Sequence, residues 1–358
     1  MSEISLRKRL PKDGSNSSKV STFEYQSRKR NRGGFAMLII PVALLCCFFI
    51  PFNSIDLGSI EKKEKKYAYD LLLDHKDLES IEKKEKKYAY ALLLDHKGLE
   101  CPARIMSSRL KRLDPHSDIV VFVARPSPTS QLDVTIHAAT RIVHMKTASN
   151  LGRWQWKNTF LKFESARLHE YDAVMFLDID NLVLQSPRYL FDVLMSTSSD
   201  VAVPEAYWLD NNFIMTGGPM IFRPSTTLDN RVSKVLDADK AMVTHDSEMD
   251  WFNEEFKQDA QVLDYMISDG IDNQGEEVQK LTYVLNDEFK NHDDLFKLGK
   301  MMGFQHPSQV LEKATMVHFI ATWKPYKNAI REIIKSGDAS KELKYLISLY
   351  DAEKMLVC

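Results

Sequence analysis

The stretch that decides the fold is Ala173-Val174-Met175-Phe176-Leu177-Asp178-Ile179-Asp180-Asn181. Its apolar run is too short for a typical helix and suits a strand buried on both faces. The strand ends in two carboxylates, Asp178 and Asp180. Because ligands of open α/β sheets bind at the carboxyl ends of the strands, these acids lie where a ligand is expected. The pair suits Mg²⁺ or Mn²⁺; taken alone, a solvated turn after a core strand is the alternative.

Apolar runs alternate with helical patterns before this stretch. The predicted strands are 88–94, 119–123 and 141–145, and the predicted helices are 102–113 and 157–168. Such alternation predicts an α/β fold with a mostly parallel sheet.

The later part of the chain has a different pattern. Two short apolar runs, Val201–Pro204 and Met220–Phe222, flank the turn signal Thr216-Gly217-Gly218-Pro219, which predicts a partly antiparallel portion. We expect the C-terminal third to be helical, including the amphipathic run 343–349.

The first 52 residues differ in composition from the rest. Residues 1–34 are basic and rich in Ser, which indicates a disordered tail, and residues 35–52 are apolar without a charge. That run is about long enough to cross a bilayer of roughly 30 Å as a single transmembrane helix. The basic cluster before it places the tail in the cytosol and the rest across the membrane, as a single-pass type II anchor; a cleaved signal peptide is the alternative.

The formal net charge of −2 gives no field that favours nucleic acid.

A duplication follows the apolar span. Residues 59–76 return at 80–97 with Asp70 replaced by Ala91. We expect the second copy to form the first strand of a luminal domain over 87–358, and the first copy to lie in a stem over 53–86. Cys101 and Cys358 remain for the luminal part, either paired with each other or both free.

Several motifs together resemble glycosyltransferase family 8, the glycogenin-like retaining transferases. The resemblance covers roughly 88–326. It rests on Phe176–Asp180, Thr216–Met220, Val317-His318-Phe319 and Trp323-Lys324-Pro325-Tyr326. Further residues are similar to the fungal, Golgi-located N-acetylglucosaminyltransferase branch of the family: Leu99-Glu100-Cys101, Ala206-Tyr207-Trp208-Leu209, and Glu248-Met249-Asp250 with Asn253.

The resemblance implies a single GT-A type nucleotide-sugar-binding domain that uses a UDP-sugar and Mn²⁺ or Mg²⁺. The leading donor is N-acetylglucosamine, and the leading acceptor is a mannose-containing glycan in the Golgi. Asp178, Asp180 and His318 would hold the metal. Lys324 would reach the diphosphate. Other donor-binding residues would be Leu92, Lys162, Thr216, Gly217 and Gly218.

Glu248 and Asp250 stand where the family places polar groups beside the reacting sugar. Met249 replaces a family glutamine, and a thioether cannot supply its amide. Either that amide is dispensable, or Glu248 or Asp250 takes over its catalytic task, with Asp250 as the first choice for orienting the sugar. The alternatives are structural: a core histidine for His318, a surface lysine for Lys162 or Lys324, and a residue of a helix's first turn for Asp250.

Three other functions compete with this interpretation. One is a phosphatase of the haloacid dehalogenase type, which also has an Asp-x-Asp after a strand; Leu182 stands where those enzymes usually have Thr. A second is a catalytically degenerate Golgi scaffold or lectin-like protein on the same fold. The third is a glycogenin-like initiator that glucosylates itself, which the membrane anchor disfavours.

Overall fold

The computed structural model describes residues 85–125, 136–146, 158–209, 215–216, 218–237, 247–271, 277–289, 295, 297–320 and 324–358. All of them belong to one compact unit, Lys83–Cys358. The predicted tail, the predicted membrane span and the first copy of the duplication lie outside the described residues. Within the described part, no helix combines the length and apolar character needed to cross a bilayer.

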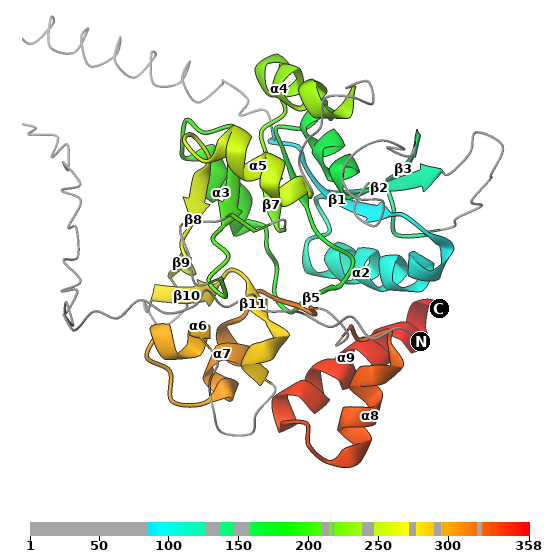
Figure 1. Cartoon of the computed structure of the whole chain (residues 1–358), viewed down its shortest axis with the longest axis vertical. Coiled ribbons are helices and arrows are strands. Elements are labelled where there is room, and N and C mark those ends of the chain that lie inside the picture. The colour runs from blue at the N-terminus through cyan, green and yellow to red at the C-terminus, as the bar shows by residue number, and fades with distance from the viewer. Residues whose placement is uncertain are drawn as a thin grey trace, which may run out of the picture. The chain divides into compact units, whose positions relative to one another are not determined.

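A seven-stranded sheet in the order β3-β2-β1-β4-β7-β6-β8 forms the centre of this unit (Figure 1). Four strands are parallel: β1 (Tyr88–Leu94), β2 (Asp118–Arg125), β3 (Arg141–Lys146) and β4 (Ala173–Phe176). β7 (Met220–Phe222) runs antiparallel to both β4 and β6 (Val201–Pro204), and β8 (Gln261–Leu263) runs parallel to β6. The predicted mostly parallel sheet with a later antiparallel portion is confirmed.

β1 is an interior strand of the sheet, and its side chains alternate between two cores. Tyr88, Tyr90, Leu92 and Leu94 pack with α2 (Glu100–Leu113) and α3 (Tyr189–Met195). Ala89 and Ala91 pack on the opposite face with side chains of α4 (Thr226–Leu236) and α5 (Glu248–Phe256). The second copy of the duplication therefore supplies the first strand, as expected.

The helix predicted over 157–168 is instead the 3₁₀ helix η3 (Thr159–Arg167). Phe160, Phe163 and Ala166 are all fully buried. A repeat of three residues per turn keeps these three side chains on one face, against the sheet.

A three-stranded sheet lies beside the main one and joins distant parts of the chain. β12 (Met316–His318) pairs antiparallel with β5 (Asn181–Val183) and parallel with β11 (Val284–Leu285). The hairpin β9 (Met266–Ile271) and β10 (Glu277–Leu281) also falls in the C-terminal third. The prediction that this third is helical is thus wrong in part, because strands of two to six residues are too short to leave a clear pattern.

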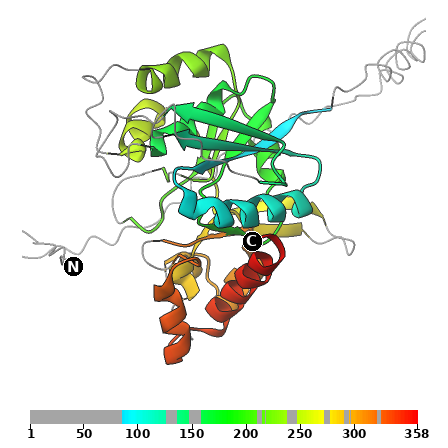
Figure 2. The ribbon, with the colours of Figure 1, turned by 90° about the vertical axis from the view of Figure 1, so that its right-hand side faces the viewer.

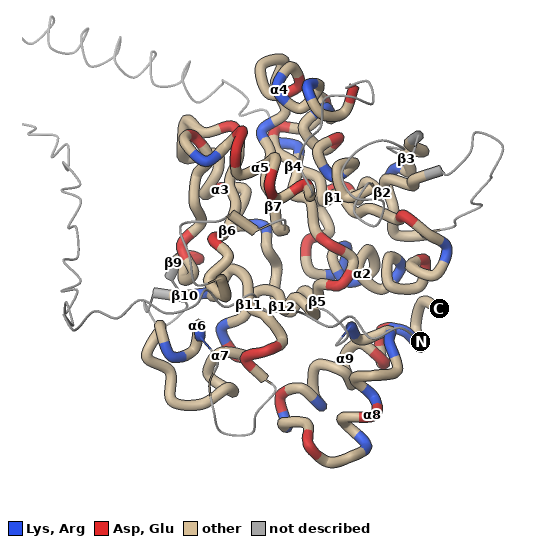
Figure 3. Tube along the Cα trace, viewed as in Figure 1, with Lys and Arg blue, Asp and Glu red and all other residues tan. Residues whose placement is uncertain are grey.

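η2 (Lys97–Leu99) directly precedes α2. The remaining elements follow β11 in the chain: η4 (Asn286–Phe289), α6 (Lys297–Met301), α7 (Pro307–Lys313), α8 (Asn328–Ser336) and α9 (Lys341–Val357). The helices α6 to α9 lie in the lower part of Figure 1. A disulfide joins Cys101 at the start of α2 to Cys358 after α9, and Glu353 of α9 contacts Arg109 of α2 at 3.0 Å. α2 and α9 lie next to each other in Figure 2. The structure thereby decides the pairing that the sequence left open. Acidic and basic positions are intermixed over the described chain (Figure 3).

Candidate metal centre

Asp178 and Asp180 lie in the turn where the chain leaves the main sheet and enters the small one. β4 ends at Phe176, and the next amide, of Leu177, donates to the carbonyl of Ala91 at 2.9 Å. The amide of Asn181 and its side-chain nitrogen both donate to the carbonyl of Asp178, at 3.0 and 2.8 Å. These bonds close a tight turn that holds both acids at the carboxyl end of β4.

His318 reaches this turn through strand pairing. It ends β12, where its partner in β5 is Asn181, and the amide of Phe319 donates to the carbonyl of Asp180 at 3.0 Å. One ligand atom each from Asp178, Asp180 and His318 lie within 4.8 Å of one another. The three predicted metal ligands are therefore brought together.

The two acids have opposite pKa shifts. Burial would raise the pKa of Asp180, but His318 and Lys324 outweigh it and hold that pKa below its usual range. Burial raises the pKa of Asp178 above its ordinary value; Lys162 opposes the shift and Asp180 adds to it. His318 Nε2 lies 3.0 Å from Asp180 Oδ1, and Lys324 Nζ contacts Asp180 Oδ2. The two carboxylates repel each other, so positive charge between them would be stabilised.

The residues present fit a divalent cation. Asp180 Oδ1 is buried, and no hydrogen bond of good geometry reaches it, in spite of the nearby His318 nitrogen. A buried carboxylate oxygen without a hydrogen bond is costly. Two carboxylates and an imidazole form a mixed oxygen and nitrogen set that suits Mn²⁺ as well as harder ions.

Lys162 and Glu248 form a buried ion pair beside Asp178. Lys162 Nζ lies 3.0 Å from Glu248 Oε1 and 3.6 Å from Asp178 Oδ1. The hydroxyl of Thr159 donates to Glu248 Oε2 at 2.6 Å. Burial would lower the pKa of Lys162, but Asp178 and Glu248 outweigh it and raise that pKa. Lys162 is thus not a surface lysine, and Glu248 is joined to the acid cluster through it.

Asp250 has a different environment. It is the third residue of α5, and its Oδ2 accepts hydrogen bonds from the amide and the hydroxyl of Ser247, at 3.1 and 2.9 Å. Its side chain is exposed. These are the contacts of a helix cap, and they do not join Asp250 to the metal ligands.

The small-residue turn approaches Asp178 closely. A Cβ built on Gly218 would lie 2.9 Å from Asp178 Oδ2, a separation that real Cβ atoms do not adopt. Thr216 is buried next to this turn. Gly217 lies outside the described residues. Leu92 is fully buried among core side chains, so in the structure its side chain faces the core.

The sequence did not single out Tyr283 of this site, whereas Asn253 is part of the family resemblance. The hydroxyl of Tyr283 contacts His318 Nδ1. The side chain of Asn253 accepts a hydrogen bond from the backbone amide of Met215 at 2.8 Å and donates one to the backbone carbonyl of Met215 at 3.1 Å. Burial and the charges of Asp178 and Asp180 raise the pKa of Tyr283 well above its usual range, so it stays a phenol. Tyr283 stands in an ordinary apolar run, and no local pattern distinguishes it.

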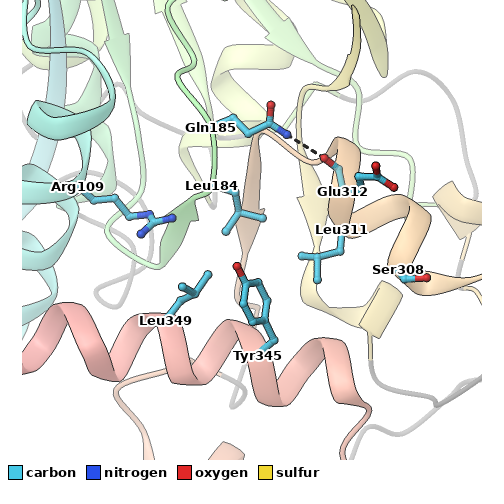
Figure 4. Close-up of a pocket in the computed structure, with 8 residues that line it drawn as sticks. All are labelled: Arg109, Leu184, Gln185, Ser308, Leu311, Glu312, Tyr345 and Leu349. Carbon is cyan, nitrogen blue, oxygen red and sulfur yellow. Dashed lines mark hydrogen bonds between the residues drawn. The ribbon is translucent and has the colours of Figure 1, made fainter.

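A separate pocket of about 370 Å³ lies between α7 and α9 (Figure 4). Tyr345 and Leu349 of α9 and Leu184, just after β5, point into it. None of the three metal-ligand candidates lines this pocket. The pocket and the acid cluster are therefore separate places in the fold.

One curated relative of the chain is Glucose N-acetyltransferase 1 from Gibberella zeae. It is 27% identical over 182 residues, which is 49% of this chain and 36% of the relative. The chain thus matches about a third of the length of that protein. No protein-family model matches the chain.

Solved structures of glycosyltransferases are similar at low identity. The bifunctional glycosyltransferase WbbM has a TM-score of 0.47 at 15% identity, over 74% of this chain and 50% of that one. The galactosyltransferase LgtC with donor and acceptor sugar analogues has a TM-score of 0.43 at 13% identity, over 73% and 95%. Likenesses at this level carry no conclusion about substrate or activity.

Proposed function

We propose that this protein is a metal-dependent glycosyltransferase that moves a sugar from a UDP-sugar to a glycan with retention of the α-configuration. The observation that carries the proposal is the convergence of Asp178, Asp180 and His318 within 4.8 Å, with Lys324 in contact with Asp180. The chain pairs two hard oxygen ligands with the ammonium groups of Lys162 and Lys324 at the carboxyl end of a parallel strand, where α/β sheets bind nucleotides.

Departure of a sugar from a nucleoside diphosphate builds negative charge on the β-phosphate. A divalent cation held by Asp178, Asp180 and His318 would stabilise that charge when bound. Lys324 would turn its ammonium from Asp180 toward the diphosphate and bind the same charge, without covalent chemistry.

Lys162 and Glu248 would organise the donor side of the site. The ammonium of Lys162 holds the carboxylates of Asp178 and Glu248 on either side of it, at 3.6 and 3.0 Å. We therefore prefer Glu248 to Asp250 as the acid that faces the reacting sugar, because Asp250 is engaged in capping α5. Gly218 would leave room for the donor sugar and for Asp178 at the same turn.

The substrates and compartment are proposed from the family resemblance. We propose N-acetylglucosamine as the donor sugar, a mannose-containing glycan as the acceptor, and a Golgi location through an N-terminal anchor. The name of the relative also describes N-acetyl transfer, which needs an amine on the sugar that accepts the acetyl group. Acetyl transfer is therefore the second candidate function.

One assay separates these candidates. The full chain in detergent is given Mn²⁺, a panel of UDP-sugars and mannose oligosaccharides, and UDP release is measured. A parallel reaction contains acetyl-CoA and glucosamine, whose amine can accept the acetyl group. We expect UDP release from one sugar only, lost in Asp178→Asn and Asp180→Asn and retained in Asp250→Asn. N-acetylated glucosamine without UDP release would favour the second candidate. If neither product forms and UDP shows no Mn²⁺-dependent binding, a scaffold role remains.

A further inference from the structure

The hydroxyl of Tyr283 contacts the imidazole of His318 on the side away from Asp180. Tyr283 directly precedes β11, whose residues Val284 and Leu285 pair with Val317 and His318. This register places the two rings 5.5 Å apart, and the hydroxyl contacts Nδ1. Only 2% of Tyr283 is exposed, so water does not replace this contact.

The other ring nitrogen of His318 faces the acid cluster. Nε2 lies 3.0 Å from Asp180 Oδ1, the buried oxygen that accepts no hydrogen bond of good geometry. A histidine that binds a metal through one nitrogen is normally oriented by a hydrogen bond at the other. In this geometry Nε2 of His318 faces the metal site, and Nδ1 takes the orienting hydrogen bond from Tyr283.

A phenolic hydroxyl suits this position because it both donates and accepts hydrogen bonds. When Nδ1 carries the proton, it donates to the Tyr283 oxygen, and Nε2 presents its lone pair to the acid cluster. In the other tautomer the hydroxyl donates to Nδ1, and Nε2–H points toward Asp180. A carboxylate or carbonyl would hold only the first tautomer, whereas Tyr283 keeps the ring in one orientation in both.

The surroundings of Tyr283 limit its movement. Its ring packs against that of Trp208 with centroids 6.0 Å apart. Trp208 in turn packs at right angles on Tyr207, whose oxygen accepts a hydrogen bond from the amide of Leu285 at 2.9 Å. The aromatic residues that pack against Tyr283 are therefore held by a hydrogen bond to β11, the strand next to β12.

We propose that Tyr283 is a positioning residue that orients His318 and allows the tautomer whose Nε2 can bind a divalent cation. The inference rests on the metal site of the proposed function. It adds a residue that acts on metal affinity through His318 and does not touch the substrate.

The test is Mn²⁺ binding to the full chain without nucleotide, followed by the electron paramagnetic resonance signal of free Mn²⁺. We expect Tyr283→Phe to bind Mn²⁺ about 10- to 100-fold more weakly, the usual effect of losing such a partner. Tyr189→Phe is the matched control, because that buried hydroxyl bonds Thr315 at 2.9 Å and not His318. It should bind Mn²⁺ as the wild type does.

A double mutant separates positioning from a general structural effect. His318→Ala alone and His318→Ala with Tyr283→Phe should bind Mn²⁺ equally, since Tyr283 acts only through the imidazole. An added loss in the double mutant would overturn the inference, and so would wild-type Mn²⁺ affinity in Tyr283→Phe.

The same titration distinguishes this inference from the proposed function. Wild-type protein that binds Mn²⁺ but transfers no sugar would sink the proposed function, while a weaker Tyr283→Phe would still support the role of Tyr283. Sugar transfer with unchanged Mn²⁺ binding in Tyr283→Phe would overturn only the inference. A wild type that binds no Mn²⁺ would overturn the metal site and the inference together.

Discussion

Lys162 and Glu248 are separated by 86 residues in the sequence and form a buried ion pair with 3.0 Å between Nζ and Oε1. Only 2% of the Lys162 side chain and 11% of the Glu248 side chain are exposed. Each charge is therefore balanced by the other, with Asp178 as a further partner of Lys162.

Replacing Lys162 with Met should destabilise the fold by about 3–5 kcal/mol, because Glu248 would keep a buried charge without its cation and Asp178 would lose a partner. Urea unfolding measures this. Lys234→Met is the matched control: Lys234 Nζ lies at the same 3.0 Å from Glu255, but 61% of the side chain is exposed. Its loss should cost at most about 1 kcal/mol. Equal effects in the two variants would contradict the buried pair.

Gly218→Ala should impair Mn²⁺ binding more than stability. The new Cβ would lie 2.9 Å from Asp178 Oδ2 and force that carboxylate to move. We expect Mn²⁺ affinity to fall about tenfold or more, measured by the same titration. Gly337→Ala should show the reverse, since Gly337 has a φ of 90° with no atom near its added Cβ. That variant should lose about 1 kcal/mol of stability with unchanged metal binding.

Ala91→Asp should prevent folding or cost several kcal/mol, because it would place a carboxylate in the core of an interior strand. Ala91 is fully buried, with Val120 and Phe176 as its partners in the neighbouring strands. The first copy of the duplication already has Asp at the matching position, Asp70. Asp70→Ala should therefore leave the melting temperature unchanged. A large shift for Asp70→Ala, or none for Ala91→Asp, would show that the copies exchange in the sheet.

Stability should depend on pH through Asp114. Burial would raise its pKa, but hydrogen bonds from Ser117 and Tyr90 and the charge of Arg188 outweigh it and lower the pKa. A lowered pKa in the folded state stabilises the protein above the unfolded pKa of about 3.9, and the contribution is lost as pH falls through the folded value.

The variant Asp114→Asn tests this sign. It should be less stable than the wild type by about 1–3 kcal/mol at pH 7. The difference should shrink as the pH is lowered below about 4, toward the folded pKa. Urea unfolding at pH 7, 5 and 3 measures it, and a difference that grows on acidification would contradict the assignment.

Much of the fold was predictable from local patterns. The strand predicted over 88–94 has the bounds of β1, and the strands predicted over 119–123 and 141–145 lie within β2 and β3. β1 and most of β2 are buried on both faces, and a buried strand must be apolar along its whole length. β3 lies at the edge of the sheet, where Arg141 and His144 are exposed. The 3₁₀ form of η3 was not predictable, because its choice depends on the packing of Phe160, Phe163 and Ala166 against the sheet.

The sequence by itself determined the strands β1–β4, β6 and β7, the acid pair at the end of β4, and the resemblance that names His318 and Lys324. Only the tertiary structure decided which distant residues meet there. β12 aligned with β5 brings His318 to Asp180, β11 brings Tyr283 to His318, and α5 brings Glu248 to Lys162 while Asp250 caps the helix. Strand formation follows from the composition of a few neighbouring residues. Strand register and the pairing of Cys101 with Cys358 follow instead from which surfaces pack together across the whole domain, and no local pattern records that choice.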